Sequence, residues 1–373
     1  MSVFEKLPFK GLAEKALGGA GTKVPLVGKL ISFANQIVSG VAALVLVIII
    51  AGAAGSCGGG GGTPKNINQL LTACEKVDNI SLLVIEEIVK KTSPNDYAKA
   101  IIKQCFDNLI RRDNFLWIYY KEGIMKHSSA EQRNELDKQF KAAASKAPPA
   151  PESDFSYSLN SEKNGIILEK YTGENLFLVI PSKVEGYPVV QIGKYTSTIP
   201  SDALFANAYF VIIPEGVKII GNGAFKEVLH AVFPSTLEKI GEFAFSGKDV
   251  FDNISMTILD LSGTSLIEIG NIAFLGMHEL KIVKLPNTLE IIKSAAFSNN
   301  SVLTDINLPA NIKRIEHGAF HNCKELNNII IPDSITQIQF PRYSYDDAAF
   351  EGCGKLPIKT RQRLQELGYK DEF

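Results

Sequence analysis

A single dipeptide, AlaPhe, recurs through the C-terminal half of the chain. It ends at Phe225, Phe245, Phe274, Phe297, Phe320 and Phe350, with a LeuPhe variant at Phe205. The intervals are 20, 20, 29, 23, 23 and 30 residues, a period typical of proteins built from stacked repeats. One such unit cannot bury its own apolar face, so neighbouring units must share a continuous core. The repeat therefore predicts a solenoid.

A second marker keeps the same phase as the first. The pattern LxxIxLP places proline at Pro181, Pro214, Pro234, Pro286, Pro309 and Pro332, with Ser262 once in its place. In the unit from Leu280, we expect Leu280, Val283 and Leu285 to point inward from a short strand that Pro286 ends, because proline cannot continue a ladder. We therefore predict a leucine-rich repeat solenoid of about seven units, with short parallel β-strands and irregular turns on the convex side.

The clearest copy of the repeat runs from Ile312 to Cys323 and continues from Ile329 to Ile338. Its pattern, IxxIxxxAFxxC followed by LxxIxIPxxVxxI, resembles the BspA-type leucine-rich repeats of bacterial and protozoan surface proteins. The resemblance covers roughly residues 165–356. It implies a cell-surface protein that binds host or bacterial partners and has no enzymatic activity. Family membership alone names no ligand, since leucine-rich solenoids serve many partners.

The N-terminal part carries a different signal, because residues 30–64 contain no charged side chain. Ile37 to Gly55 would form a helix of about 29 Å, which matches the thickness of a bilayer core. Five lysines precede it against two glutamates: Lys6, Lys10, Lys15, Lys23 and Lys29 against Glu5 and Glu14. This excess predicts a cytoplasmic N-terminus and an exported remainder.

Two interpretations of this segment anchor the chain in a membrane. One is an uncleaved spanning helix, and the other is lipidation of Cys57 after cleavage, since small residues precede this cysteine and Gly58 to Gly62 follow it. Against lipidation, Ala54 stands where the lipoprotein motif prefers leucine, and the preceding segment is longer than an ordinary signal peptide. A buried core helix is a third interpretation, which the absence of a polar rim disfavours.

Between the anchor and the repeats the pattern is helical. Ser93 followed by Pro94, and Ser128 with Glu131, have the spacing of helix starts. We predict helices at 65–77, 79–91, 94–112, 114–126 and 129–146. The expected organisation is a basic leader (1–30), a hydrophobic membrane segment (31–56), a Gly-rich tether (57–64), a small all-α module (65–146), a Pro-rich linker (147–160), the solenoid (161–356) and a capping helix (357–373).

Several classes of function are disfavoured by the sequence. With 39 Lys plus Arg against 40 Asp plus Glu, no excess of positive charge points to nucleic acid. No nucleophile motif, phosphate loop or paired-carboxylate arrangement stands out, so we expect neither an enzyme nor a bound cofactor. His317, His321 and Cys323 are disfavoured as a metal site because Cys323 occupies a repeat column with Cys353. Those two cysteines are expected to be buried thiols, and pairing of Cys74 with Cys105 stays open.

Only the x positions of LxxIxL can meet a partner on the concave face, and they change character along the chain. The early units are apolar and the later ones polar. The candidate partner-binding residues are Tyr209, Phe210, Ile212, Leu229, His230, Val232, Ile258, Lys281, Ile282 and Lys284. Exposed apolar side chains of this kind mark interaction sites, but the helical module or an insertion could cover them instead.

We therefore expect a membrane-anchored protein with its solenoid outside the cytoplasm, at the cell surface or in the periplasm. Its expected work is protein–protein interaction, with adhesion to host matrix or bacterial surface proteins as the leading hypothesis. The alternative is a periplasmic scaffold that binds one of the cell's own proteins. The sequence leaves the ligand and the oligomeric state open.

Overall fold

The structure is a computed structural model that describes most of the chain from residue 62 onward. The described residues are 62–76, 80–107, 123–144, 146–173, 175, 177–194, 204–205, 208, 210–225, 228, 230–246, 256–335, 337–338, 348–370 and 373. The predicted membrane segment and Cys57 lie outside them. Among the described residues, no helix combines the length and apolar character needed to cross a bilayer.

The chain forms two compact units, and the division cuts across the expected helical module. Helices α4 (Ile67–Glu75) and α5 (Leu82–Lys91) belong to one unit, whereas α6 (Pro94–Asp107) and α8 (Ala130–Ala144) belong to the unit that contains the solenoid. In the first unit, Asn66 caps α4 and Ser81 caps α5 through their side-chain oxygens. Capping by short polar side chains fixes where each helix starts.

The helices of the second unit also begin at capping residues. The Ser93 hydroxyl accepts from the Asp96 backbone N–H at 3.2 Å, so α6 starts at the predicted Pro94. Helix α8 starts with a reciprocal capping box between Ser129 and Gln132, at 2.8 and 3.1 Å, one residue later than the predicted box. The two helices pack together, and Gln139 of α8 donates to Asn95 of α6 at 2.6 Å.

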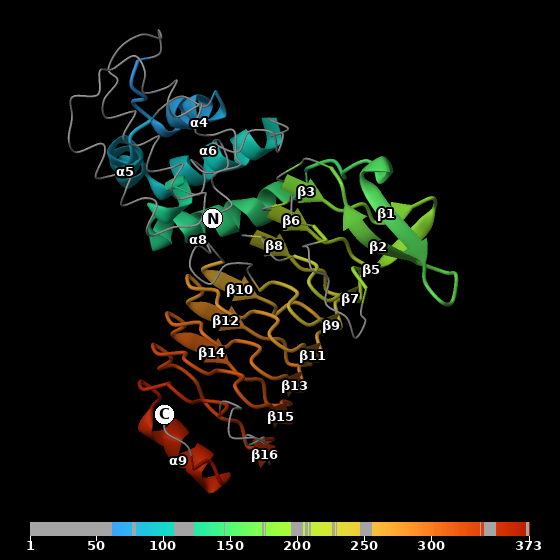
Figure 1. The fold of residues 1–373 in the computed structure, drawn as a ribbon, viewed down its shortest axis with the longest axis vertical. Coiled ribbons are helices and arrows are strands. Elements are labelled where there is room, and N and C mark those ends of the chain that lie inside the picture. The colour runs from blue at the N-terminus through green and yellow to red at the C-terminus, as the bar shows by residue number, and fades with distance from the viewer. Residues whose placement is uncertain are drawn as a thin grey trace, which may run out of the picture. The chain divides into compact units, whose positions relative to one another are not determined.

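The solenoid starts with antiparallel pairs and continues as a parallel ladder (Figure 1). After a short 3₁₀ turn (Glu152–Asp154), β1 (Phe155–Leu159) pairs with β2 (Ile166–Tyr171), and β4 (Lys183–Val184) pairs with β5 (Tyr187–Ile192). From β2 the ladder runs in parallel through β5 and the following two-residue strands: β7 (Ile219–Ile220), β9 (Lys239–Ile240), β11 (Glu268–Ile269), β13 (Ile291–Ile292), β15 (Arg314–Ile315) and β16 (Gln337–Ile338).

The LxxIxL segments form a second set of strands, split into two sheets. One sheet contains β3 (Phe177–Val179), β6 (Phe210–Ile212) and β8 (His230–Val232); the other contains β10 (Ile258–Asp260), β12 (Ile282–Lys284) and β14 (Asp305–Asn307). A bridge from Asp305 to Asn328 extends the second sheet. The split between β8 and β10 overlaps the start of the 29-residue interval from Phe245 to Phe274. We call the outward surface of these strands the LxxIxL face.

The core is a column of phenylalanine rings that runs from turn to turn. Phe205, Phe225, Phe245, Phe274, Phe297, Phe320 and Phe350 are all buried, with consecutive ring centroids 5.1 to 5.7 Å apart. Leu280, Val283 and Leu285 point inward as the repeat pattern predicts. Stacked rings at this spacing contribute beyond their buried area, so the AlaPhe repeat fixes the core of every turn.

A C-terminal helix, α9 (Ile358–Glu366), closes the last turn. The Thr360 hydroxyl donates to the Ile329 carbonyl at 2.6 Å, and the Phe350 N–H donates to the Tyr369 hydroxyl at 3.1 Å. Gly368 adopts a φ of +91°, a conformation that glycine reaches without a steric cost, and the helix ends just before it. These contacts are those of a solenoid cap.

Candidate binding surface

Side chains alternate across each strand of the LxxIxL face. The middle residue of most of these strands, such as Val211, Leu259 or Val283, is buried in the core, and its two neighbours point outward. Parallel register aligns Phe177, Phe210 and His230 in one outward row across β3, β6 and β8. The same register aligns Ile258, Ile282 and Asp305 across β10, β12 and β14.

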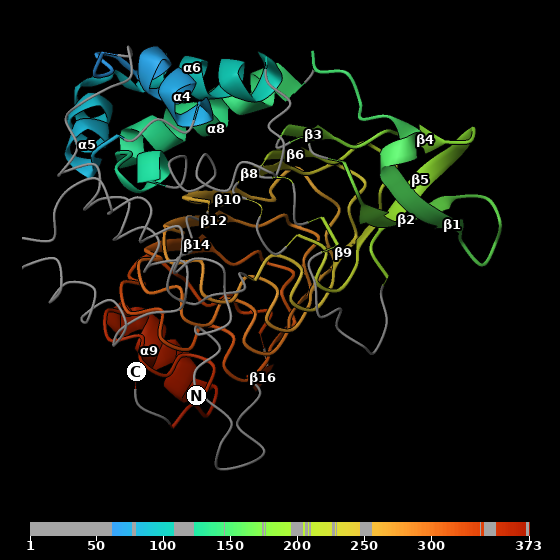
Figure 2. The same cartoon turned by 45° about the horizontal axis from the view of Figure 1, so that its top comes forward.

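Helix α8 lies beside β3, β6 and β8, as both ribbon views show (Figures 1 and 2), and it covers the aromatic row of this sheet. The Phe140 ring, 2% exposed, has its centroid 5.0 Å from Phe177, 5.2 Å from Phe210 and 6.0 Å from His230. Phe210 in turn stacks on the His230 ring at 5.0 Å and an interplanar angle of 6°. Burial of four aromatic rings makes this contact the apolar centre of the helix–solenoid interface.

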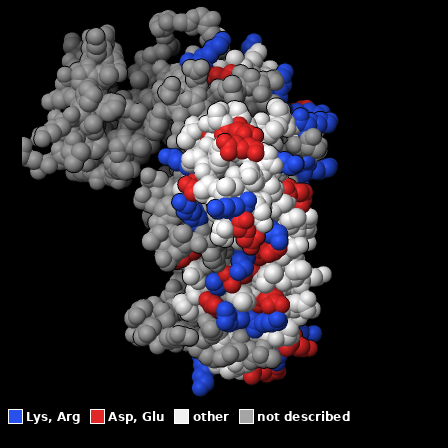
Figure 3. All heavy atoms as spheres, turned by 90° about the vertical axis from the view of Figure 1, so that its right-hand side faces the viewer, with Lys and Arg blue, Asp and Glu red and all other residues white. Residues whose placement is uncertain are grey.

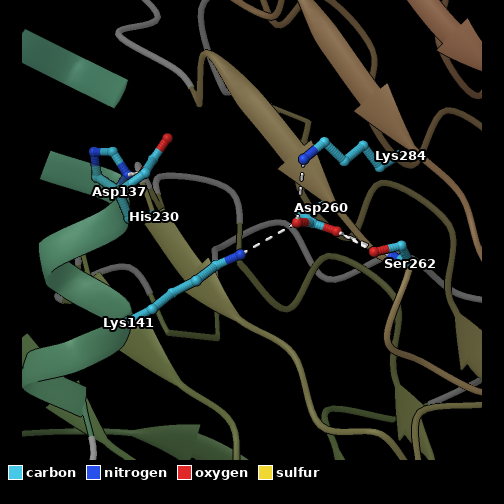
Figure 4. A network of polar contacts seen from close by, with 6 residues as sticks. All are labelled: Asp137, Lys141, His230, Asp260, Ser262 and Lys284. Atoms are coloured by element: carbon cyan, nitrogen blue, oxygen red, sulfur yellow. Dashed lines mark hydrogen bonds and ion pairs between the residues drawn. The ribbon is translucent and has the colours of Figure 1, made fainter. Parts of the chain in front are cut away.

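A histidine–carboxylate pair lies beside this aromatic cluster. Asp137, one turn before Phe140 on α8, binds His230 Nδ1 through its Oδ1 atom (Figure 4). The other carboxylate oxygen, Oδ2, is buried and has no hydrogen-bond partner among the described residues. A buried carboxylate oxygen without a partner carries a desolvation penalty, so the pairing of the other oxygen with His230 is important for keeping Asp137 in place.

Helix α8 also reaches the second sheet, across the split between β8 and β10. Lys141 Nζ lies 3.4 Å from Asp260 Oδ2, and Lys284 Nζ lies 3.8 Å from the same atom (Figure 4). At the other end of the helix, Arg133 Nη1 lies 2.5 Å from Glu279 Oε2, just before β12. The helix therefore joins the two sheets of the LxxIxL face.

The local environment of Asp260 stabilises its charged form. Burial raises the pKa of this carboxyl, but hydrogen bonds from the Ser262 hydroxyl (2.6 Å) and backbone N–H (3.2 Å) lower it, as do Lys141 and Lys284. The net effect places the pKa of Asp260 below its ordinary value. The carboxylate is thus charged at neutral pH and available for both lysines.

The second half of the face is open and polar. Lys284, Asn307, Asn327 and Asn328 are exposed, and Ile330 is 77% exposed. Asn328 Nδ2 donates to Asp305 Oδ1 at 2.5 Å. Hydrogen bonds from Thr304 and then from Asn328 lower the pKa of Asp305, so this carboxyl is also charged at neutral pH.

The candidate residues divide between the covered and the open half. Phe210 and His230 are buried under α8, which agrees with the alternative interpretation of internal cover. Ile212, Val232, Ile258, Lys281 and Ile282 are half-buried, and Lys284 is exposed. Tyr209 and Leu229 lie outside the described residues, as does Cys57.

Sequence reasoning missed the helix side of this interface. The residues that contact the solenoid include Arg133, Asp137, Phe140 and Lys141. Their spacing of four, three and one residues places them on one side of a helix. That stripe, with an aromatic residue among charges of both signs, is the signal from which the contact could have been suspected.

Two cysteines of the repeat column are buried thiols. Cys323 Sγ donates to the Phe297 carbonyl at 3.2 Å and Cys353 Sγ to the Phe320 carbonyl at 3.1 Å. Burial, and then the neighbouring Cys353, raise the pKa of the Cys323 thiol well above its ordinary value. Cys74 is buried in α4, and the side chain of Cys105 falls outside the described part. Within that part, no group of three or more His, Cys, Asp or Glu could hold a metal ion.

The side of the solenoid formed by the two-residue strands carries charges of both signs (Figure 3). Neighbouring turns pair them, as in Lys218 with Glu238 at 3.1 Å and Lys313 with Glu290 at 2.7 Å. Because opposite charges alternate, this side presents no extended patch of one sign.

Comparison with known proteins agrees with the repeat pattern. Six copies of the BspA type leucine rich repeat region match residues 198–256 and 247–370. No protein of curated function matches the chain.

Three solved leucine-rich repeat structures illustrate the similarity. A T. pallidum protein is 26% identical, over 61% of this chain and 99% of that one, with a TM-score of 0.48. A Bacteroides ovatus protein is 23% identical, over 50% and 54%, with a TM-score of 0.33. The pneumococcal vaccine antigen PcpA is 20% identical, over 51% and 49%, with a TM-score of 0.35. The family match shows that residues 198–370 of this chain belong to the BspA type leucine-rich repeats.

Proposed function

We propose that this protein binds a protein partner through the open half of the LxxIxL face. The observation that carries the proposal is the contrast within one face: α8 covers the aromatic half, whereas Lys284, Asn328 and Ile330 of the other half are exposed. An exposed isoleucine among polar and charged neighbours has the composition of a protein interface, with apolar contact area inside a polar rim.

The anchor predicted from residues 37–55, with or without lipidation at Cys57, would hold the solenoid outside the cytoplasm. From there the partner would be a host matrix protein or a bacterial surface protein, and the activity would be adhesion. If the solenoid is enclosed in the periplasm, its partner is instead one of the cell's own envelope proteins.

A photo-crosslinking amino acid placed on each side of the solenoid tests the binding surface. The two positions are Lys284, on the open half, and Lys313, which is exposed on the opposite ladder and makes a comparable ion pair with Glu290. We expect protein adducts from position 284 and none from position 313, in full-length protein expressed in its own cells. Equal adducts at both positions, or none at 284, would contradict the proposal.

Protease shaving of intact cells tests the location. Peptides from residues 155–370 should be released while a periplasmic control protein stays intact, if the solenoid is displayed on the surface. Protection of the solenoid until the envelope is broken would rule out adhesion and leave the periplasmic scaffold.

A further inference from the structure

The side chains of α8 that face the solenoid are complementary to the groups they meet there. Along α8 these are Arg133, Asp137, Phe140 and Lys141. Their spacing keeps them on one side of the helix across two turns.

On the solenoid, each of these side chains has a matching partner: the charged ones meet an ionisable group and Phe140 meets aromatic rings. Glu279 lies 2.5 Å from Arg133, His230 binds Asp137, and Asp260 lies 3.4 Å from Lys141. The Phe140 ring enters the row formed by Phe177, Phe210 and His230. An aromatic anchor surrounded by ordered charges is how grooves recognise amphipathic helices.

The contacts that hold α8 have features that a competing helix could exploit. The Lys141 side chain is about half exposed, so its ion pair with Asp260 is weak. Asp137 Oδ2 is buried without a hydrogen-bond partner among the described residues, which penalises the bound state of α8 itself.

We propose that this half of the face is a helix-binding site that α8 occupies in cis. Its ligand class is an amphipathic helix of a partner protein, with an aromatic residue directly before a basic one and an acidic residue one turn earlier. α8 then acts as an intramolecular competitor, and the site becomes available when the helix is displaced. This site meets the open half at Asp260, which Lys284 also approaches. Its test measures peptide binding, so failure of crosslinking at Lys284 would not decide it.

The test uses full-length protein and a labelled synthetic peptide of residues 128–146. Lys141→Glu in the protein replaces the attraction to Asp260 by repulsion and weakens α8 in cis. Lys138→Glu is the matched control, because Lys138 is exposed and pairs only with Glu135 of its own helix among the described residues. We expect the K141E protein to bind the peptide roughly fivefold more tightly than wild type or K138E.

Two further arms establish that the peptide occupies the α8 site. A peptide with Phe140→Ala should lose at least about tenfold in affinity, since it lacks the aromatic anchor. A peptide with Lys141→Glu should bind the Asp260→Lys protein more tightly than the unmodified peptide does. Equal peptide affinity for wild type, K138E and K141E, or binding that ignores the Phe140 and Asp260 changes, would overturn the proposal and make α8 a fixed part of the fold.

Discussion

The two halves of the LxxIxL face share one backbone pattern but present different surfaces. In both, the strands are parallel and three residues long, and the middle side chain packs in or against the core. In the first half, Phe177, Phe210 and His230 are buried under α8. In the second half, the equivalent rows contain Ile282, Lys284, Asp305 and Asn307, and α8 reaches this half through ion pairs of Lys141 and Arg133.

This difference shows how a repeat protein separates folding from recognition. The inward positions are set by the need to fill a common core, so they repeat from turn to turn. The outward positions carry no such constraint, and their side chains decide whether a second element packs there or solvent does. Aromatic rows recruit a helix, and polar rows stay open.

The largest effect is expected from the core that both halves share. Phe297→Ala removes a fully buried ring that lies 5.4 Å from Phe274 and 5.7 Å from Phe320. The substitution should lower the free energy of unfolding by about 3 to 5 kcal/mol, as measured by chemical denaturation. Lys313→Ala, on the surface, is the control. A loss below about 1 kcal/mol would contradict the assignment of the ring column as the core.

The second largest loss of stability should come from a substitution in the covered half. Phe140→Ala removes the ring that contacts Phe177, Phe210 and His230. We expect a loss of about 3 kcal/mol, at the low end of the range for a buried phenylalanine. Denaturation of the full-length variant measures it. A neutral substitution would mean that α8 does not cover these residues.

The effects of substituting His230 and Asp137 on the free energy of unfolding should not be additive, because the two side chains form a pair. His230→Ala leaves the half-buried Asp137 carboxylate with neither oxygen bonded in the described contacts, so it should cost about 1 to 3 kcal/mol. In the Asp137→Ala background the same change should cost clearly less, because no buried charge is then left behind. A double-mutant cycle of denaturation measurements gives the coupling. Strict additivity would contradict a direct pair.

The Asp260 contacts should make the interface sensitive to acid. The pKa of Asp260 is lower in the folded state than the ordinary 3.8, so the carboxylate stabilises the fold above that pH. Its contribution is lost as the pH falls through the folded-state pKa. We expect Asp260→Asn to destabilise by less than about 1 kcal/mol at pH 7 and to lose this difference in acid. A difference that grows in acid would reverse the assigned sign.

The smallest effect is expected on the open half. Ile330→Asp changes a side chain that is 77% exposed, so the free energy of unfolding should stay within about 0.5 kcal/mol of wild type. Thermal denaturation and circular dichroism would check this. A loss of several kcal/mol would show that Ile330 is covered, and the contrast between the halves would then disappear.

The solenoid and its inward residues could be predicted from the sequence because a repeated core pattern admits few arrangements. The AlaPhe column, the inward Leu280, Val283 and Leu285, and the resemblance to BspA-type repeats are all confirmed. That a helix covers Phe210 and His230 could be stated from the sequence only as an alternative to partner binding. It depends on which face of α8 meets the strands, a long-range contact between residues 137 and 230 that periodicity does not encode.

The division of the LxxIxL face into two sheets could also not be predicted from the sequence pattern. The 29-residue interval between Phe245 and Phe274 indicates an insertion, but not that the ladder of LxxIxL strands is interrupted while the other ladder continues. An insertion can loop out of one ladder at little cost if the other keeps its register. The role of Lys141 and Arg133 in joining the two sheets follows only from the structure.

Hydroxyl-radical footprinting of the full-length protein tests the central claim most directly, because it reports side-chain exposure. The account predicts that Phe140 and Phe210 are protected from oxidation in the wild type while Ile330 is oxidised. In the Phe140→Ala variant, oxidation of Phe210 should rise and that of Ile330 should not change. Oxidation of Phe210 in the wild type at a rate that the Phe140→Ala change does not alter would contradict the account.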